Sequence, residues 1–108
     1  MGKLIQKLLY ELKGKGALVK GGELLFEIPY ELQFLQEIVD DGGEEKITGL
    51  ADFSGQILPN DQYQLAVLVG SEVTLRLEHA RCLNVIIQSS SGNLIKRGEI
   101  YKCGEPNR

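Results

Sequence analysis

The sequence has no tryptophan, one histidine, one methionine and two cysteines among its 108 residues. Aromatic residues make up only 6% of the chain, so a core has to be built mainly from Leu, Ile and Val. Two cysteines are too few for the disulfide framework of a small secreted domain. With 43% hydrophobic and 25% charged residues, the composition is nevertheless that of a globular chain and not of a disordered one.

Long hydrophobic runs are also missing. A membrane-spanning helix needs about 20 consecutive apolar residues, and the longest uninterrupted run here is Leu65–Val69. Lys7, Glu11 and Lys13 interrupt the N-terminal segment, which argues against a signal-peptide core. We therefore expect a cytoplasmic protein that does not enter a membrane.

The net charge of -3 provides no basic field to hold a nucleic acid or an anionic membrane. The charges are unevenly distributed, however. Residues 1–20 carry five lysines against Glu11, a balance of +4, whereas residues 21–52 carry nine acidic residues against Lys46, a balance of -8. One interpretation is two solvated faces of opposite sign; the functional one is a surface that selects a charged partner.

Two segments have the spacing of amphipathic helices. Over residues 3–13 the apolar residues recur three and four positions apart, which would place Leu4, Ile5, Leu8, Leu9 and Leu12 on one side of a helix that packs on the sheet. Residues 29–41 begin with Pro29, a favourable first helical residue, and their apolar residues would cover about 200° of a helical surface. We predict a helix in each segment, the first ended by Gly14 and Gly16 and the second by Gly42 and Gly43. We expect the wide face of the second helix to be buried against a sheet or a second subunit.

Most of the remaining segments alternate apolar and polar residues, as strands do. Gly21 and Gly22 separate two of them and suit a tight hairpin turn. The expected strands are 17–20, 23–28, 46–58 (two short strands or one bulged strand), 63–69, 72–78, 82–88 and 94–103.

The predicted architecture is α+β: two amphipathic helices packed on one face of a mostly antiparallel sheet of five or six strands. We expect a single domain over residues 1–104 and a frayed C-terminal tail at 105–108.

The hairpin formed by residues 72–78 and 82–88 has a register that can be tested. Burial of one face requires a loop of odd length around His79. A loop of residues 79–81 would place Leu77 opposite Leu83. Because this loop contains no glycine, one long bent strand is the alternative.

The state of Cys82 and Cys103 stays open at this point. Two reduced structural thiols are the first interpretation, since cytoplasmic thiols are usually reduced. A single disulfide between the late strands is the alternative, because a hairpin could bring the two cysteines opposite each other.

The residues expected to bind a protein partner lie on the predicted helix 29–41 and in the acidic loop after it. They are Tyr30, Phe34, Ile38, Asp40, Asp41, Glu44 and Glu45. The loop lacks the ligand spacing of an EF-hand. We therefore expect a solvated acidic loop, with docking to a basic partner or weak divalent-ion binding as the alternatives.

A second set of residues would serve a nucleic-acid-binding function. The basic residues Arg76, Arg81, Lys96, Arg97 and Lys102 could share one face of the sheet with Tyr101. Basic residues next to an aromatic ring suit single-stranded nucleic acid. Acidic residues lie among them, however, and only one aromatic residue is near, so this function is less favoured.

No catalytic, cofactor or metal constellation stands out in the sequence. His79, Cys82 and Cys103 fall short of the four ligands of a structural zinc site, and the glycine pairs lack the pattern of a phosphate-binding loop. We predict a small non-enzymatic domain without a cofactor that acts through a protein partner or self-association, with a homodimer as one form. A nucleic-acid-binding module is the first alternative, and a small-molecule-binding protein or enzyme with a pocket between helices and sheet is the second.

Overall fold

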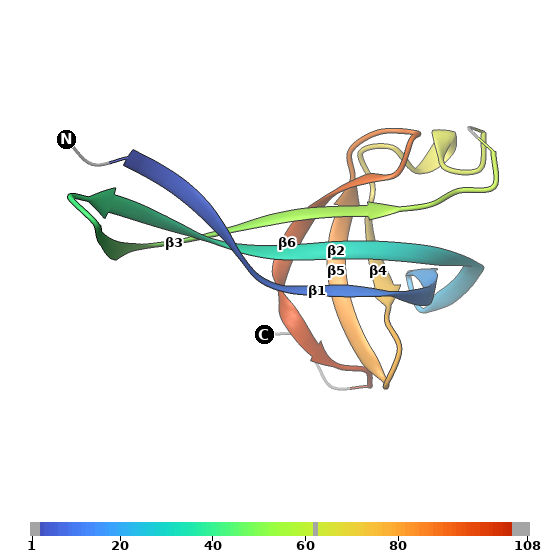
Figure 1. Cartoon of the computed structure of the whole chain (residues 1–108). Helices are drawn as coiled ribbons and strands as arrows, with labels where there is room; N and C mark the ends of the chain where they lie inside the picture. The colour runs from blue at the N-terminus through green and yellow to red at the C-terminus, as the bar shows by residue number, and fades with distance from the viewer. Residues whose placement is uncertain (1–2, 62, 105–108) are drawn as a thin grey trace.

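The computed structural model describes residues 3–61 and 63–104, and at residues 3, 4, 40, 41 and 44–51 it describes the backbone alone. The chain forms six strands and one turn of 3-10 helix (Figure 1). These are β1 (Lys3–Lys20), β2 (Glu23–Asp41), β3 (Glu44–Ile57), η1 (Ala66–Leu68), β4 (Glu72–Arg76), β5 (Arg81–Ile87) and β6 (Asn93–Lys102). No helix in the described residues is long and apolar enough to cross a membrane.

The strands close into a barrel in the order β1-β2-β3-β6-β5-β4, and all neighbouring strands are antiparallel. Two short contacts close it: β1 pairs with β4 over Ala17–Val19, and β3 pairs with β6 over Gly55–Gln56. The first three strands are much longer than these contacts, so they continue beyond the barrel as a three-stranded sheet (Figure 1).

We call this extension the arm. It comprises Lys3–Glu11 of β1, Gln33–Asp41 of β2 and Glu44–Ser54 of β3. The arm makes the molecule elongated, with extents of 51 × 31 × 22 Å.

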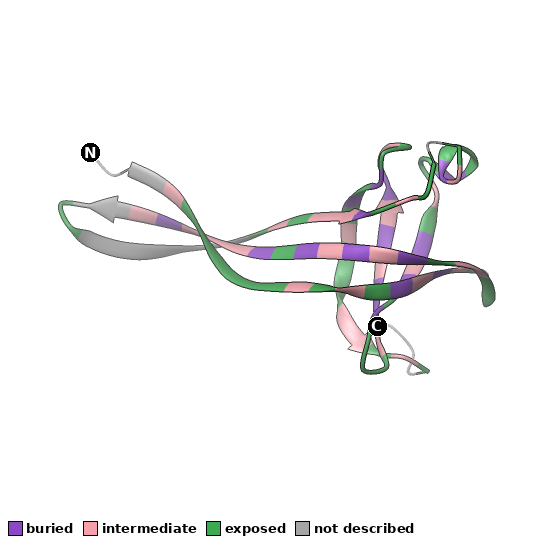
Figure 2. Cartoon of the chain, turned by 45° about the vertical axis from the view of Figure 1, so that its right-hand side comes forward, coloured by how far each residue is buried: buried purple, intermediate pink, exposed green. Residues whose placement is uncertain are grey.

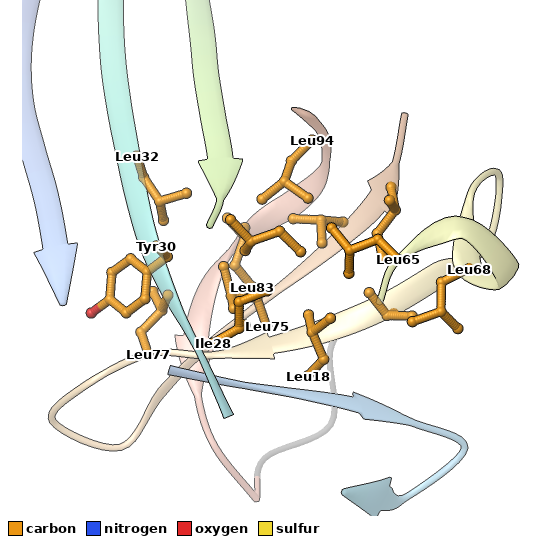
Figure 3. Close-up of a cluster of buried hydrophobic side chains, with 14 of the residues drawn as sticks. Leu18, Ile28, Tyr30, Leu32, Leu65, Leu68, Leu75, Leu77, Leu83 and Leu94 are labelled. Atoms are coloured by element: carbon orange, nitrogen blue, oxygen red, sulfur yellow. The ribbon is translucent and has the colours of Figure 1, made fainter. Parts of the chain in front are cut away.

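The core of the barrel is mainly aliphatic, as the low aromatic content predicted, with Tyr30 among its members (Figure 3). Burying one such side chain stabilises the fold by about 1.5–3 kcal/mol. The most deeply buried side chains of the core are Leu18, Ile28, Leu32, Ile57, Leu65, Leu75, Leu83, Val85 and Ile87. Leu65 and Leu68, from the segment around η1, complete the core cluster (Figure 3).

The predicted helix over residues 3–13 is wrong, because this segment is part of β1 and the fold is all-β instead of α+β. Apolar residues on both faces of β1, together with a β-bulge, account for the error. The register between β1 and β2 shifts between Leu8 and Tyr10, so one extra residue interrupts the alternation of the strand. Before the bulge, Ile5 pairs with Ile38 and Leu8 pairs with Leu35, on opposite faces of the sheet, so apolar residues three positions apart occupy both faces of β1 at a spacing that is also typical of a helix.

The predicted helix over residues 29–41 is wrong as well, because this segment is part of β2. Residues 30, 32, 34 and 38 share one face of β2 and are buried. Leu35 and Val39 lie on the other face and are half buried. An apolar arc of about 200° is what two faces of one strand produce when they are plotted on a helical wheel.

Pro29 lies within β2, opposite Lys15 of β1. The last pair between β2 and β3 joins Tyr30 to Ile57, so Pro29 is just beyond the ladder with β3. There its missing N–H costs no hydrogen bond to β3. Its carbonyl oxygen accepts a hydrogen bond from the N–H of Leu58 at 2.9 Å.

The glycines predicted to end the first helix instead make room for Tyr30. A Cβ atom at Gly16 would come within 3.0 Å of the Tyr30 ring and would also meet the carbonyl oxygen of Arg76. The Tyr30 hydroxyl accepts a hydrogen bond from the N–H of Glu78 at 3.2 Å. Gly16 thus allows β1 to approach β4 where the barrel closes.

Several strand predictions are confirmed and one is wrong. Gly21 and Gly22 form the turn between β1 and β2, both with positive φ. Of the two interpretations of residues 46–58, the single bulged strand is correct. The strand predicted over residues 63–69 is wrong, because that segment forms a loop containing η1. The strands are antiparallel and six in number, but they close into a barrel, and two of them contain the segments predicted to be helices.

The loop between β4 and β5 has an odd number of residues, as predicted, but the two strands pair in a different register. Leu75 lies opposite Leu83, and the N–H of Leu77 donates to the carbonyl of Arg81 at 2.7 Å. The loop is therefore residues 78–80 instead of 79–81, and the single bent strand is excluded. His79 and Ala80 supply the tight turn with φ values of 63° and 57°, which glycine would ordinarily provide.

Cys82 and Cys103 form a disulfide, the alternative interpretation of the two cysteines. Their Cα atoms are 5.3 Å apart. The bond joins the start of β5 to the residue that follows β6.

Candidate functional site

The arm is a single-layered sheet bordered by two outer strands. Among the described residues, β1 has a second neighbour only at Ala17–Val19 and β3 only at Gly55–Gln56. In the arm, β1 and β3 are therefore the outermost strands on either side of β2. Natural proteins usually shorten or cover such edges, because an edge strand is a template for pairing with another chain.

A row of three aromatic rings lies where the arm leaves the barrel. Tyr10, Phe34 and Phe53 occupy the same row of β1, β2 and β3. The rings of Tyr10 and Phe34 stack with centroids 4.5 Å apart, and those of Phe34 and Phe53 meet edge to face at 5.3 Å. The Lys96 ammonium lies 5.9 Å from the centre of the Phe34 ring.

Three consecutive apolar residues are exposed on β1 within the arm. Leu8, Leu9 and Tyr10 expose 51%, 55% and 49% of their surface. The burial colouring shows this part of β1 as exposed (Figure 2). Scattered exposed apolar residues are ordinary, but these three are adjacent on an outermost strand. Leu8 pairs with Leu35 and Tyr10 pairs with Phe34, so this edge of the arm is apolar on both faces of the sheet, which suits contact with protein.

Polar side chains bridge the strands of the arm next to this apolar stretch. The amide of Gln6 donates to the carboxylate of Asp52 at 2.6 Å, which links β1 to β3 across β2. The amide of Gln33 donates to Glu11 at 2.9 Å, and the ammonium of Lys13 lies 3.4 Å from the same carboxylate. The Gln33 hydrogen bond and then Lys13 hold the pKa of Glu11 below its ordinary value.

The residues predicted to bind a partner fall into three environments. Tyr30 is 2% exposed in the barrel core. Phe34 and Ile38 belong to the arm but are 6% and 4% exposed. The side chains of Asp40, Asp41, Glu44 and Glu45 lie outside the described residues, and their backbone flanks the turn of Gly42 and Gly43 at the end of the arm.

The basic residues considered for nucleic acid are paired with acids or separated. Arg97 lies 3.3 Å from Glu72, and Lys96 lies 3.0 Å from Glu99. Arg97 is opposite Asn84 on β5, whereas Lys96 extends over Phe34. Arg81 and Lys102 face each other across β5 and β6, and Arg76 lies at the end of β4.

Two other surface features stand apart from the arm. A shallow polar hollow of about 220 Å³ is lined by Glu31, Gln33, Ser54, Gly55, Gln56 and Asn93. In the loop around η1, Tyr63 and Val67 are 75% and 87% exposed. The hollow is polar, and its Glu31 carboxylate already accepts a hydrogen bond from Gln56 at 3.3 Å.

Comparison with known proteins identifies no relative. No family model, curated protein or solved structure matches this chain. Functional inference therefore depends on the arm itself.

Sequence reasoning did not identify Leu8 and Leu9, because both were assigned to the buried face of a helix. The signal available in the sequence was the run of Leu8, Leu9 and Tyr10, three apolar residues in succession. A strand turns consecutive residues to opposite faces, so a run of three marks either a strand covered on both sides or a bulge.

Proposed function

We propose that this chain is a structural module without enzymatic activity, and that it self-associates through the arm. The observation that carries the proposal is the exposure of Leu8, Leu9 and Tyr10 on an outermost strand. A second copy of the chain is the partner.

The size of the exposed surface supports this partner. A monomer of 12.0 kDa is expected to expose about 6,000 Å², whereas this chain exposes 6956 Å². The excess, about 1,000 Å², is close to the roughly 800 Å² that each partner contributes to a standard interface. The radius of gyration, 15.8 Å against about 13 Å for a compact chain of this length, supports the same conclusion.

The two alternative functions have weaker support. A nucleic-acid surface needs basic side chains that converge, and two of the five candidates are paired with carboxylates. A small-molecule site is usually an apolar pocket with a few polar groups, and the hollow around Glu31 and Gln33 is shallow and polar.

The disulfide bears on the compartment in which the protein works. Disulfides persist mainly in oxidising compartments and are rare in the cytoplasm. The bond between Cys82 and Cys103 therefore supports a compartment outside the cytoplasm, in place of the cytoplasmic location expected from the sequence.

Light scattering coupled to size exclusion tests the proposal. The wild-type chain should have a mass above 12.0 kDa that rises with concentration. The variant Leu8→Glu/Leu9→Glu replaces two exposed apolar side chains of the arm with carboxylates and should remain a monomer. Val67→Glu is the control, because Val67 is also an exposed apolar residue, at 87%, but lies in the loop around η1. A monomeric wild type at all concentrations up to about 100 µM, where contacts of even modest affinity are populated, contradicts the proposal.

A further inference from the structure

The two outer strands of the arm carry opposite charge along their sequence. Over Lys3–Gly16, the part of β1 not paired with β4, four lysines stand against Glu11, a balance of +3. Over Glu44–Ser54, the part of β3 not paired with β6, three acidic residues stand against Lys46, a balance of -2. Contact between two copies of β1 would therefore bring like charges together, whereas contact between β1 and β3 would bring opposite charges together.

Residues that pair with one another across the three strands of the arm, which we call a row, are also chemically similar. The row of Tyr10, Phe34 and Phe53 is aromatic throughout, and the row of Ile5, Ile38 and Ile47 is isoleucine throughout by sequence. If a second copy lay beside β3 in the same orientation, its Tyr10 would follow Phe53 and its Ile5 would follow Ile47. The half-exposed ring of Tyr10 would then have an aromatic neighbour on both sides.

The same displacement would place a lysine beside an acidic residue at the end of the arm. Lys3 pairs in register with Asp40, and Asp40 pairs with Glu45. If β1 of a second copy lay beside β3 in this register, Lys3 of that copy would be next to Glu45. Opposite charges at adjacent positions of neighbouring strands are favourable.

We infer that β1 of one copy pairs with β3 of the next, in parallel, so that the arms of successive copies form one continuous sheet. This inference rests on the proposed self-association and specifies its geometry. The contact is head to tail, because it joins two different surfaces. Such contacts close into rings or extend as filaments, so assemblies of more than two copies are expected.

Charge exchange between the two strands tests the inference. Lys3→Glu/Lys7→Glu changes the balance of the β1 segment from +3 to -1, and Glu44→Lys/Glu45→Lys changes that of the β3 segment from -2 to +2. Each variant alone should show at least a tenfold loss of association by sedimentation velocity. An equimolar mixture should recover association, because each contact between unlike variants again joins opposite charges. Circular dichroism and the urea midpoint establish that both variants are folded.

The outcomes distinguish a failure of the β1–β3 pairing from a failure of the proposed self-association. If Glu44→Lys/Glu45→Lys associates like wild type, or if the mixture recovers nothing, the pairing of β1 with β3 is overturned while self-association stands. If the wild type does not associate, the proposed function itself fails.

The unmodified chain provides a second test that no folding defect can obscure. Contact between oppositely charged strands should weaken several-fold as NaCl rises from about 0.02 to 0.3 M, where charges are increasingly screened. Contact between two copies of β1 should strengthen instead, and that result would overturn the inference.

Discussion

Tyr10 stacks on Phe34 with ring centroids 4.5 Å apart and planes 14° from parallel. The contact covers Phe34, which is 6% exposed, and leaves Tyr10 49% exposed on the outermost strand of the arm. Phe34 thus contributes to the stability of the fold. Tyr10 does so too, and it also belongs to the surface through which we propose that two copies associate.

Phe34→Ala should destabilise the chain by about 3–5 kcal/mol, because it removes a buried aromatic ring that two others contact. Tyr10→Ala should cost less, and a double-mutant cycle should give a coupling of about 0.5–1.5 kcal/mol. Urea unfolding measures both. Tyr63→Ala, at an exposed ring in the η1 loop, is the control and should change stability by less than about 0.5 kcal/mol. Additive effects of the two arm substitutions would show that the stack contributes nothing.

Gly92→Ala should be markedly destabilising. Gly92 has a φ of 104°, and an added Cβ atom would meet the carbonyl oxygen of Ile57. Gly70→Ala is the matched control, because Gly70 has a φ of 85° but no atom within 4 Å of an added Cβ. The backbone penalty of about 1 kcal/mol applies at both sites, so the additional loss at Gly92 measures the steric conflict. Equal urea midpoints for the two variants would contradict the close approach of Gly92 to Ile57.

Reduction of the disulfide between Cys82 and Cys103 should lower the free energy of unfolding by about 3 kcal/mol. The bond closes a loop of 21 residues, and the loop-entropy model gives this magnitude. Urea unfolding with and without a thiol reductant measures the effect, and Cys82→Ser/Cys103→Ser should reproduce it without reductant. Free thiols in the protein purified without reductant, detected by mass spectrometry after alkylation, would count against the bond.

Gln33→Ala should raise the pKa of Glu11 towards its ordinary value, because the Gln33 amide is the largest cause of its depression. A carboxyl with a lowered pKa in the folded state stabilises the fold above its unfolded pKa, and this contribution is lost as pH falls through the folded pKa. The difference in free energy of unfolding between the wild type and Gln33→Ala should therefore become smaller as the pH falls through the pKa of Glu11 in the folded state. Carbon-13 NMR titration of the Glu11 carboxyl measures the shift, and an unchanged titration curve would exclude the hydrogen bond as its cause.

The sequence predicted the later half of the fold better than the first half. Residues 72–78 alternate without interruption, so their strand and the buried face of Leu75 followed directly from the pattern. The hairpin register could not be obtained in the same way, because a displacement of two residues preserves the buried face. His79 and Ala80 adopt left-handed φ without being glycine, and no local pattern indicated that turn.

The arm was missed for a different physical reason. Both β1 and β2 carry apolar residues on both faces, and a bulge between Leu8 and Tyr10 further breaks the alternation of β1, so both segments imitate helices. An isolated apolar pattern does not specify what will cover it. Only the tertiary arrangement shows that Leu8 and Leu9 lie on an outermost strand instead of against a sheet.

Amide hydrogen exchange along β1 tests the central claim most directly, because it reports which backbone groups become covered as copies meet. In peptides covering residues 5–11, exchange should slow by at least tenfold when the concentration rises from about 1 µM to 200 µM, as mass action predicts. Peptides covering β5, which has neighbours on both sides in the barrel, should exchange at the same rate at both concentrations. Exchange over residues 5–11 that is independent of concentration would contradict self-association through the arm.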